Sequence, residues 1–128
     1  MAGLAVGVVN SILNAMCKGT AYTLPRASYV QLHTGDPGSA GTAHIATNNT
    51  RQACTFNVDA ATGSIANSAT TTWPAVPATE TYTYFSVWTA ATSGTFCFSG
   101  AITNGDVTDG QLAQFAVGAL VVSMTVAS

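Results

Sequence analysis

Short runs of alternating residues, each closed by a cluster of turn-forming residues, dominate the sequence after Pro25. In these runs β-branched or aromatic side chains recur at every second position, which is the period of a strand. Thr, Val, Tyr, Phe and Trp, which favour strands, make up much of each run. The runs that we interpret as strands are residues 28–34, 50–58, 68–75, 81–90, 94–103, 111–118 and 119–127.

Turn chemistry separates these runs. Gly, Pro, Asn and Asp in "GDPGSAG", "AATGS", "WPAVPA", "ATSG" and "TNGDVTDGQ" supply backbone angles that strands do not adopt. Many short strands joined by turns are typical of an antiparallel sandwich or barrel. We therefore predict an all-β antiparallel β-sandwich over residues 25–128, jelly-roll-like, with about eight strands.

The first 24 residues have a helical period instead. We predict an N-terminal apolar helix or arm over residues 1–24, and we expect its apolar stripe to dock or to form an oligomer. The stripe consists of Leu4, Val8, Val9, Ile12, Leu13 and Met16. No charged residue precedes Lys18, so the helix should lie against protein on more than one side. That protein is either a neighbouring subunit or the end of its own domain.

This segment does not fit a targeting signal. It lacks a basic start, and its first cation, Lys18, follows the apolar run. Asn10, Ser11 and Asn14 interrupt the run, so we do not expect it to cross a membrane.

Charge is scarce throughout the chain. Charged residues make up 6% of the 128 residues, against about 25% in an ordinary soluble domain. Three cations cannot neutralise many phosphates, so we expect no nucleic-acid partner. Two explanations remain open: a secreted or extracellular β protein, or a subunit that neighbours largely cover.

Two small polar clusters are candidate sites. His33, Asp36 and His44 could bind a metal or act as acid and base. However, "DPG" at Asp36 is what a turn requires, and we favour that interpretation. Asp106 and Asp109 lie among glycines as in a calcium loop, but the terminal Glu is missing and a hairpin turn fits better.

Nothing else indicates catalysis. Cys17, Cys54 and Cys97 are odd in number and widely spaced, so we expect small buried side chains rather than disulfides or a zinc site. No GxSxG motif is present. We predict no enzyme activity, no cofactor and no metal.

Aromatic residues have two possible roles. Trp73, Tyr82, Tyr84 and Trp88 could stack on sugars, but such residues are more often core or inter-subunit anchors. We assign the anchor role to Trp73, Tyr84, Phe85 and Trp88.

The order of several phrases is also informative. An apolar helix leads to "YVQLHTGDPGSAGT" and "RQACTF", and then come "ATTTWPA", "FSVWTAATSG", "FSGAIT" and "QLAQFAVGALVVSMTV". This order resembles small virion structural proteins of tailed bacteriophages, of the minor capsid, decoration or tail-fibre type, common in phages of actinobacteria. The resemblance implies a non-enzymatic, jelly-roll-like and often trimeric particle component. The family has no known catalytic residues to transfer.

These observations lead to one expectation and two rivals. We expect a capsid decoration protein that forms a homotrimer and clamps the major capsid protein of the virion. The first alternative is a tail-tip or tail-fibre component that contacts tail proteins and the host surface, with glycan binding as an option. The second is a small secreted hydrolase, which would require His33 or His44 to meet an acid.

Overall fold

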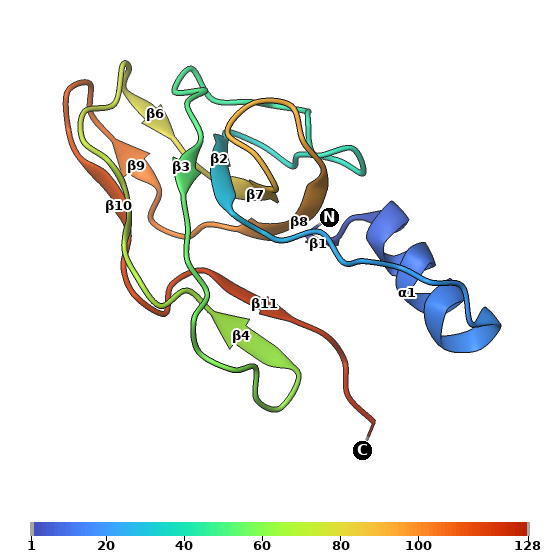
Figure 1. Cartoon of the computed structure of the whole chain (residues 1–128). Helices are drawn as coiled ribbons and strands as arrows, with labels where there is room; N and C mark the ends of the chain where they lie inside the picture. The colour runs from blue at the N-terminus through green and yellow to red at the C-terminus, as the bar shows by residue number, and fades with distance from the viewer. Residues whose placement is uncertain (1, 128) are drawn as a thin grey trace.

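The computed structural model describes residues 2–127, which form one helix and eleven short strands (Figure 1). In chain order the elements are β1 (Gly3–Leu4), α1 (Val6–Lys18), β2 (Tyr29–His33), β3 (Gln52–Ala53), β4 (Ser64–Ala66), β5 (Thr71–Trp73), β6 (Glu80–Thr81), β7 (Tyr84–Trp88), β8 (Phe96–Ala101), β9 (Asp106–Val107), β10 (Ala113–Phe115) and β11 (Val121–Ser123).

A five-stranded antiparallel sheet with the order β1-β8-β7-β2-β3 forms the centre of the molecule. Strands β2 and β7 pair along their full lengths, with Leu32 opposite Phe85. Strands β7 and β8 form a hairpin whose register shifts after Val87. At the outer edge of β8, β1 adds a short fifth strand with Leu4 opposite Phe98. The sheet therefore connects residues near the start of the described chain, in β1, to strand β8.

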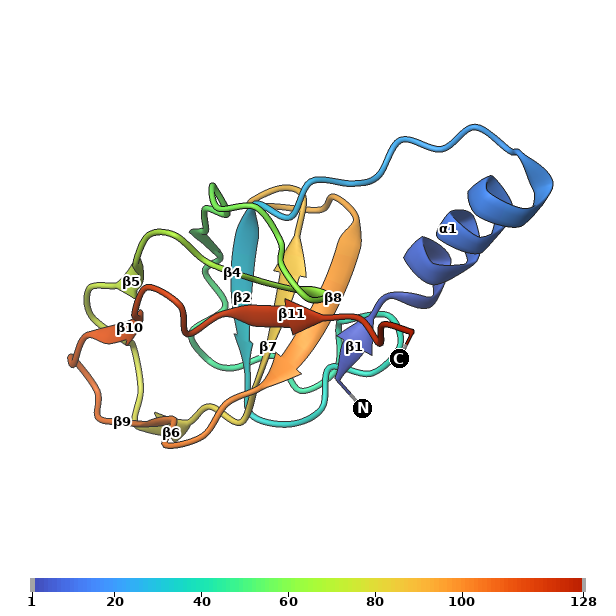
Figure 2. The ribbon, with the colours of Figure 1, turned by 90° about the horizontal axis from the view of Figure 1, so that it is seen from below.

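Short ribbons form the second layer. Figure 2 shows β4 and β11 crossing the sheet, and β5 and β10 continue this layer beyond β2. The apolar face of the sheet and these ribbons enclose one core, whose members include Val30, Leu32, Trp73, Phe85, Val87, Phe98, Ala113 and Leu120. The predicted all-β antiparallel sandwich is confirmed. The described residues form one five-stranded sheet and three two-stranded ribbons, so the jelly-roll detail is not confirmed.

The core is held by aromatic rings in edge contact. The ring of Phe85 lies 5.5 Å from that of Phe115 and 6.4 Å from that of Phe98. Trp73 meets Phe115 at 6.0 Å. These T-shaped pairs are a preferred geometry, because the positive edge of one ring meets the negative face of the next. The rings thereby connect the sheet to the ribbons.

Several strand limits differ from the prediction. Residues 50–58 were expected to be one strand, but β3 pairs with β2 only at Gln52–Ala53, and beyond it the Thr55 carbonyl accepts from the Ser68 N–H instead. Strands β1, β4 and β9 lie in segments predicted as arm, turn or loop, and β6 overlaps the predicted run 81–90 only at Thr81. Each has only two or three paired residues, which is too short for an alternating pattern to show.

The N-terminal segment is partly integrated into the sheet. Residues 3 and 4 belong to β1, and α1 then projects away from the body before residues 19–28 return to β2 (Figures 1 and 2). Gly19 ends the helix in the left-handed conformation that favours glycine. Residue 1 begins the predicted segment 1–24, and residue 128 ends the predicted segment 25–128. Both lie outside the described residues.

Gly100 lies against the ring of Phe85, so a substitution at this position can test the packing of the core. A Cβ added at Gly100 would collide with the Phe85 ring, whereas one added at Gly7 in α1 would meet nothing. We expect Gly100→Ala to lower the free energy of unfolding by about 1–3 kcal/mol. Gly7→Ala, the matched control, should raise it by up to about 1 kcal/mol. Urea denaturation at one protein concentration measures both.

Combining Gly100→Ala with Phe85→Leu should recover part of the loss, because the smaller side chain makes room for the methyl group. A Gly100→Ala variant as stable as the wild type would contradict the described position of Phe85.

Candidate functional site

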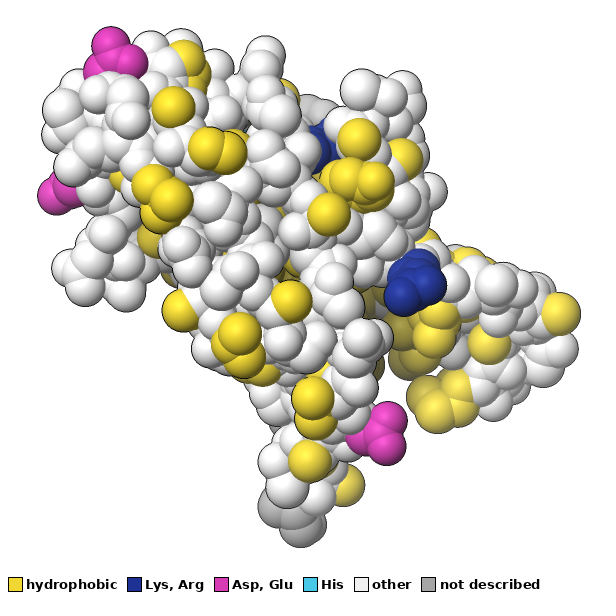
Figure 3. Space-filling model, turned by 60° about the vertical axis from the view of Figure 1, so that its left-hand side comes forward, with side chains coloured by type: hydrophobic (Ala, Val, Ile, Leu, Met, Phe, Trp, Pro, Cys, Tyr) yellow, Lys and Arg dark blue, Asp and Glu magenta, His cyan; other side chains and the backbone are white. Residues whose placement is uncertain are grey.

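Helix α1 carries the predicted stripe, and the part of that stripe near the end of the helix is exposed. Val8 is the buried residue of the helix, and Leu4, Val9 and Ile12 are half-buried. Leu13 is 48% exposed and Met16 72% exposed. Figure 3 shows few charged side chains on the face that it displays, which otherwise consists of apolar and uncharged polar atoms. The helix therefore presents an apolar surface that its own domain leaves open.

The helix is also weakly supported by its own sequence. It has no side-chain N-cap bond and no acidic residue in its first turn, although Lys18 complements the dipole in the last turn. Isolated helices of fewer than about 12–15 residues are marginal in water. A 13-residue helix with so little support is therefore only marginally stable by itself.

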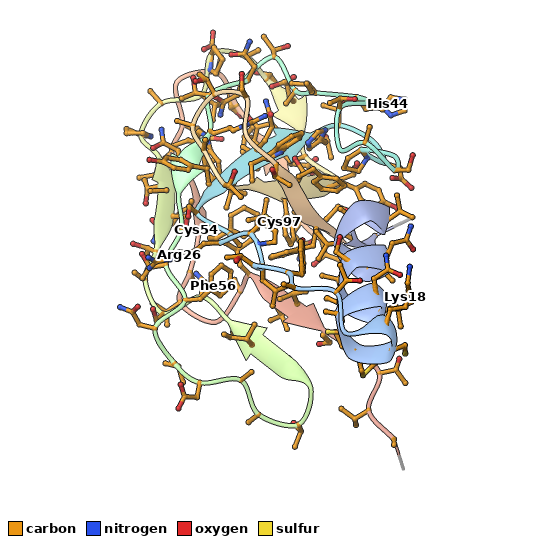
Figure 4. All side chains as sticks on the ribbon, turned by 45° about the vertical axis from the view of Figure 1, so that its right-hand side comes forward. Lys18, Arg26, His44, Cys54, Phe56 and Cys97 are labelled. Carbon is orange, nitrogen blue, oxygen red and sulfur yellow. The ribbon has the colours of Figure 1, made fainter. Side chains whose placement is uncertain are left out.

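A small apolar groove lies on the body near the segment that returns from the helix. Its volume is about 220 Å³, and its lining consists of Arg26, Ala27, Ser28, Cys54, Phe56, Ile65, Phe98 and Val122. Figure 4 shows Cys54, Phe56 and Arg26 close together on the body, with Lys18 on α1. Sequence analysis missed this groove, because its residues come from five separate segments.

The thiols are unsuited to chemistry in this environment. Burial, and then the neighbouring Cys97, raise the pKa of the Cys54 thiol to about 11. Burial also raises the pKa of Cys97. A reactive thiol needs a lowered pKa. Cys54 and Cys97 thus act as small core side chains, while Cys17 is exposed; none of the three forms a disulfide.

His33 is buried in a directional chain of hydrogen bonds. Its Nδ1–H donates to the Ala43 carbonyl at 2.7 Å, because a carbonyl can only accept. Its Nε2 must then accept from the Ser86 hydroxyl, also at 2.7 Å. That hydroxyl oxygen accepts from the Trp88 indole N–H at 2.8 Å. Both imidazole nitrogens are thus used, and the ring is held neutral.

The candidate metal cluster, which the sequence made less favoured than a turn, does not assemble. His33 is buried, whereas His44 is exposed and its Nδ1 pairs with the backbone oxygen of Asp36 at 2.9 Å. The Asp36 carboxylate accepts from the Gly38 N–H, and Gly38 has a φ of 74°. The turn interpretation is confirmed. Within residues 2–127, no three His, Cys, Asp or Glu side chains are grouped as a metal would require.

The polar face of the sheet is closed by residues 34–51. The Gln31 amide donates to the Asn49 carbonyl at 3.1 Å and accepts from Arg51 Nε at 3.1 Å. The Arg51 guanidinium lies 4.0 Å from the centre of the Trp88 ring. A cation over an aromatic face is attracted by the ring quadrupole. The Gln31 and Arg51 side chains on this face therefore have partners within the described residues.

The aromatic residues lie mostly inside the molecule. Trp73, Phe85 and Trp88 are buried, and Tyr84 is half-buried. The Trp73 indole donates to the Thr50 carbonyl at 2.7 Å, and Tyr82, also buried, has its hydroxyl 3.4 Å from the Asn48 amide. Little ring surface in this group remains for stacking on a sugar.

The two acids of the candidate calcium loop, Asp106 and Asp109, lie in different elements. Asp106 lies in β9 and accepts from the Thr81 hydroxyl at 2.6 Å, while Asp109 lies in the turn that follows.

No helix among the described residues is long and apolar enough to cross a membrane.

The His33 chain makes stability depend on pH. Burial lowers the pKa of His33 below 6.5, positive charge on His44 and Arg51 lowers it further, and the bond to the Ala43 carbonyl opposes the shift. As the pH falls below 6.5, His33 binds a proton in the unfolded chain but stays neutral in the folded chain. The free energy of unfolding should therefore decrease from about pH 6.5 towards pH 5.

Unfolding in urea at several pH values measures this slope. We expect His33→Gln to be less stable at neutral pH but to lose most of the slope, with His44→Gln as the matched control. A slope that is unchanged in His33→Gln would assign the acid sensitivity to other groups.

Comparison with known proteins supplies the family. A search of curated proteins finds no match. A family model described as "Podophage GP4 fiber I protein gp80" matches residues 4–123, which include α1 and every strand from β2 to β11. With a match over nearly its whole length, the chain belongs to the podophage GP4 fiber I protein gp80 family and is a structural protein of a bacteriophage virion.

Proposed function

We propose that the chain is a non-enzymatic subunit of a tail fibre, which associates with copies of itself through helix α1. The single observation that carries this proposal is the uncovered apolar stripe of α1, on which Leu13 and Met16 are about half or more exposed. The family's description as a fibre protein favours a fibre over the capsid decoration role that the sequence suggested.

Exposure of the apolar stripe to water is unfavourable in free energy, and self-association removes this exposure. Each apolar side chain of this size gains about 1.5–3 kcal/mol when it is fully buried. No acidic or basic side chain lies between Val6 and Cys17, so burying this surface desolvates no charge. A homotrimer repeats this contact and joins several weak contacts into one stable assembly. Other virion proteins then attach to the assembled fibre.

A mechanical rather than chemical role agrees with the internal saturation of the polar groups. Every buried side-chain nitrogen and oxygen in residues 2–127 has a hydrogen-bond partner. The His33 imidazole is committed to Ala43 and Ser86, so neither of its nitrogens can act on a substrate. We propose that no reaction is catalysed and that neither nucleic acid nor lipid is a partner.

The double variant Leu13→Gln and Met16→Gln tests the helix contact. Gln keeps a high helix propensity but removes the apolar surface, so the β layers should fold as in the wild type. We expect a trimeric wild type and a monomeric variant in size-exclusion chromatography with light scattering. Val58→Gln, which changes an exposed apolar residue far from α1 in the sequence, should remain trimeric.

Point substitutions are preferable to a deletion here, because removing residues 3 and 4 would also remove strand β1. A wild-type chain that stays monomeric at high concentration, or a double variant that still forms trimers, would contradict association through α1.

Copy number distinguishes a fibre from a capsid decoration. Purified virions analysed by quantitative mass spectrometry should contain far fewer copies of this chain than of the major capsid protein. A count comparable with the major capsid protein would restore the decoration role and exclude a fibre.

A further inference from the structure

Residues 35–46, which we call the 35–46 loop, fold back beside β2. Two backbone hydrogen bonds join the loop to the chain at this strand. The Thr34 N–H donates to the His44 carbonyl at 2.9 Å, and the Ala46 N–H donates to the Leu32 carbonyl at 3.1 Å. Most residues of the loop are exposed. A segment with few buried contacts opens more readily than the core of its domain.

The His33 side chain attaches this loop to the sheet. Its Nδ1–H donates to the Ala43 carbonyl at 2.7 Å, and the imidazole is fully buried. The side-chain contact from Thr34 is longer, at 3.4 Å, and exposed. The residues after the loop have additional support, because the Glu80 carboxylate accepts from the N–H groups of residues 47 and 48. Attachment of the 35–46 loop therefore depends strongly on one imidazole.

A protonated His33 would not fit this chain of hydrogen bonds. The neutral ring accepts at Nε2 from the Ser86 hydroxyl, whose oxygen accepts from the Trp88 indole N–H. A proton on Nε2 would turn this acceptor into a donor that points at the Ser86 oxygen. The Ser86 hydroxyl would then lose its acceptor, and among the described residues it has no second one. A buried donor without an acceptor is unfavourable, so these bonds select the neutral ring.

The charges around His33 also oppose a proton. Burial lowers the pKa of the imidazole, and the positive charges of His44 and Arg51 lower it further. The acid of the loop, Asp36, accepts from a backbone N–H in its own turn. Strand β7 carries no Asp, Glu, Lys, Arg or His, and its titratable residue is Tyr84. When the loop moves away, water reaches the ring and His44 leaves with the loop, so the pKa of His33 returns towards its ordinary value.

We propose that the 35–46 loop is an acid-released cover, which opens when His33 gains a proton while the five-stranded sheet stays folded. Gly41 of the loop lies so close to the Phe96 ring that no side chain would fit between them. Other residues of the loop form one wall of a groove of about 350 Å³, which Leu4 and Val6 also line. Opening exposes the Phe96 ring and the apolar base of α1. The inference goes beyond the proposed assembly, since it concerns a single chain.

Native-state hydrogen exchange, followed by NMR on the full chain, separates loop opening from global unfolding. The Thr34 and Ala46 amides report the loop, and the interior amides of β7, which lies between β2 and β8, report the whole fold. Local opening exposes little surface. We therefore expect lower protection at Thr34 and Ala46 than in β7, and little response of these two amides to low concentrations of urea.

The pH dependence of this exchange tests the role of His33. The pKa of His33 is below 6.5 when the loop is closed and returns towards 6.5 when the loop opens, so protons favour the open loop. After correction for intrinsic exchange, the opening constant from Thr34 and Ala46 should rise by up to about tenfold per pH unit below pH 6.5. The imidazole resonances of His33 should titrate below pH 6.5, and loop protection should fall between pH 6.5 and that midpoint.

Two variants assign the effect to one side chain. His33→Gln removes the titrating ring but keeps an amide that can donate to Ala43 and accept from Ser86, so opening of its loop should not depend on pH in this range. His44→Gln, the matched control, removes the exposed histidine and should keep most of the dependence.

Exchange at Thr34 and Ala46 that does not change between pH 7 and pH 5 would overturn the proposal, and so would a pH dependence that persists in His33→Gln. Equal protection and equal urea dependence at these amides and in β7 would assign the acid response to the whole fold and refute a local cover. Should His33→Gln fail to fold, the wild-type imidazole resonances decide, because a loop that opens while His33 stays neutral contradicts the mechanism.

Discussion

The central hairpin is buried on both faces, and this double burial is the constraint on which the rest of the structure depends. One face of β7 supplies Phe85 and Val87 to the apolar core, and the other supplies Ser86 and Trp88 to a dry polar layer. A buried polar group without a partner costs about 1–3 kcal/mol. The hydrogen bonds that link Trp88, Ser86 and His33 to the Ala43 carbonyl remove that cost. They also hold residues 34–51 over the sheet.

From the sequence it was possible to predict strands whose side chains alternate and turns formed by residues that favour them. Strands β2, β7 and β8 fall inside predicted runs, and the Asp36 turn has the expected geometry. Alternation could not reveal that the second face of β7 is also buried, because the covering loop is fixed by His33, whose partners are ten and 53 positions away. Both grooves were invisible for the same reason: residues far apart in sequence meet only after the layers have packed.

The scarcity of charge has different consequences in the two parts of the molecule. Within the β layers the few charged groups are used locally, as when the Glu80 carboxylate accepts from the Thr47 and Asn48 N–H groups. On α1 no charged residue precedes Lys18, and Val8 is the buried residue of an otherwise exposed or half-buried helix. Charged groups such as Glu80 are therefore paired within the β layers, whereas exposed apolar side chains lie on the helix.

The double attachment of α1 has a mechanical consequence. One end of the helix continues into β1, where Ala5 N–H bonds the Cys97 carbonyl, and the other returns to β2, where Ser28 N–H bonds the Trp88 carbonyl. Tension applied to the helix is thus divided between the outer edge and the interior of the same sheet. Neighbouring strands would have to slide past one another against several hydrogen bonds at once, so the central sheet would resist a pull on this helix.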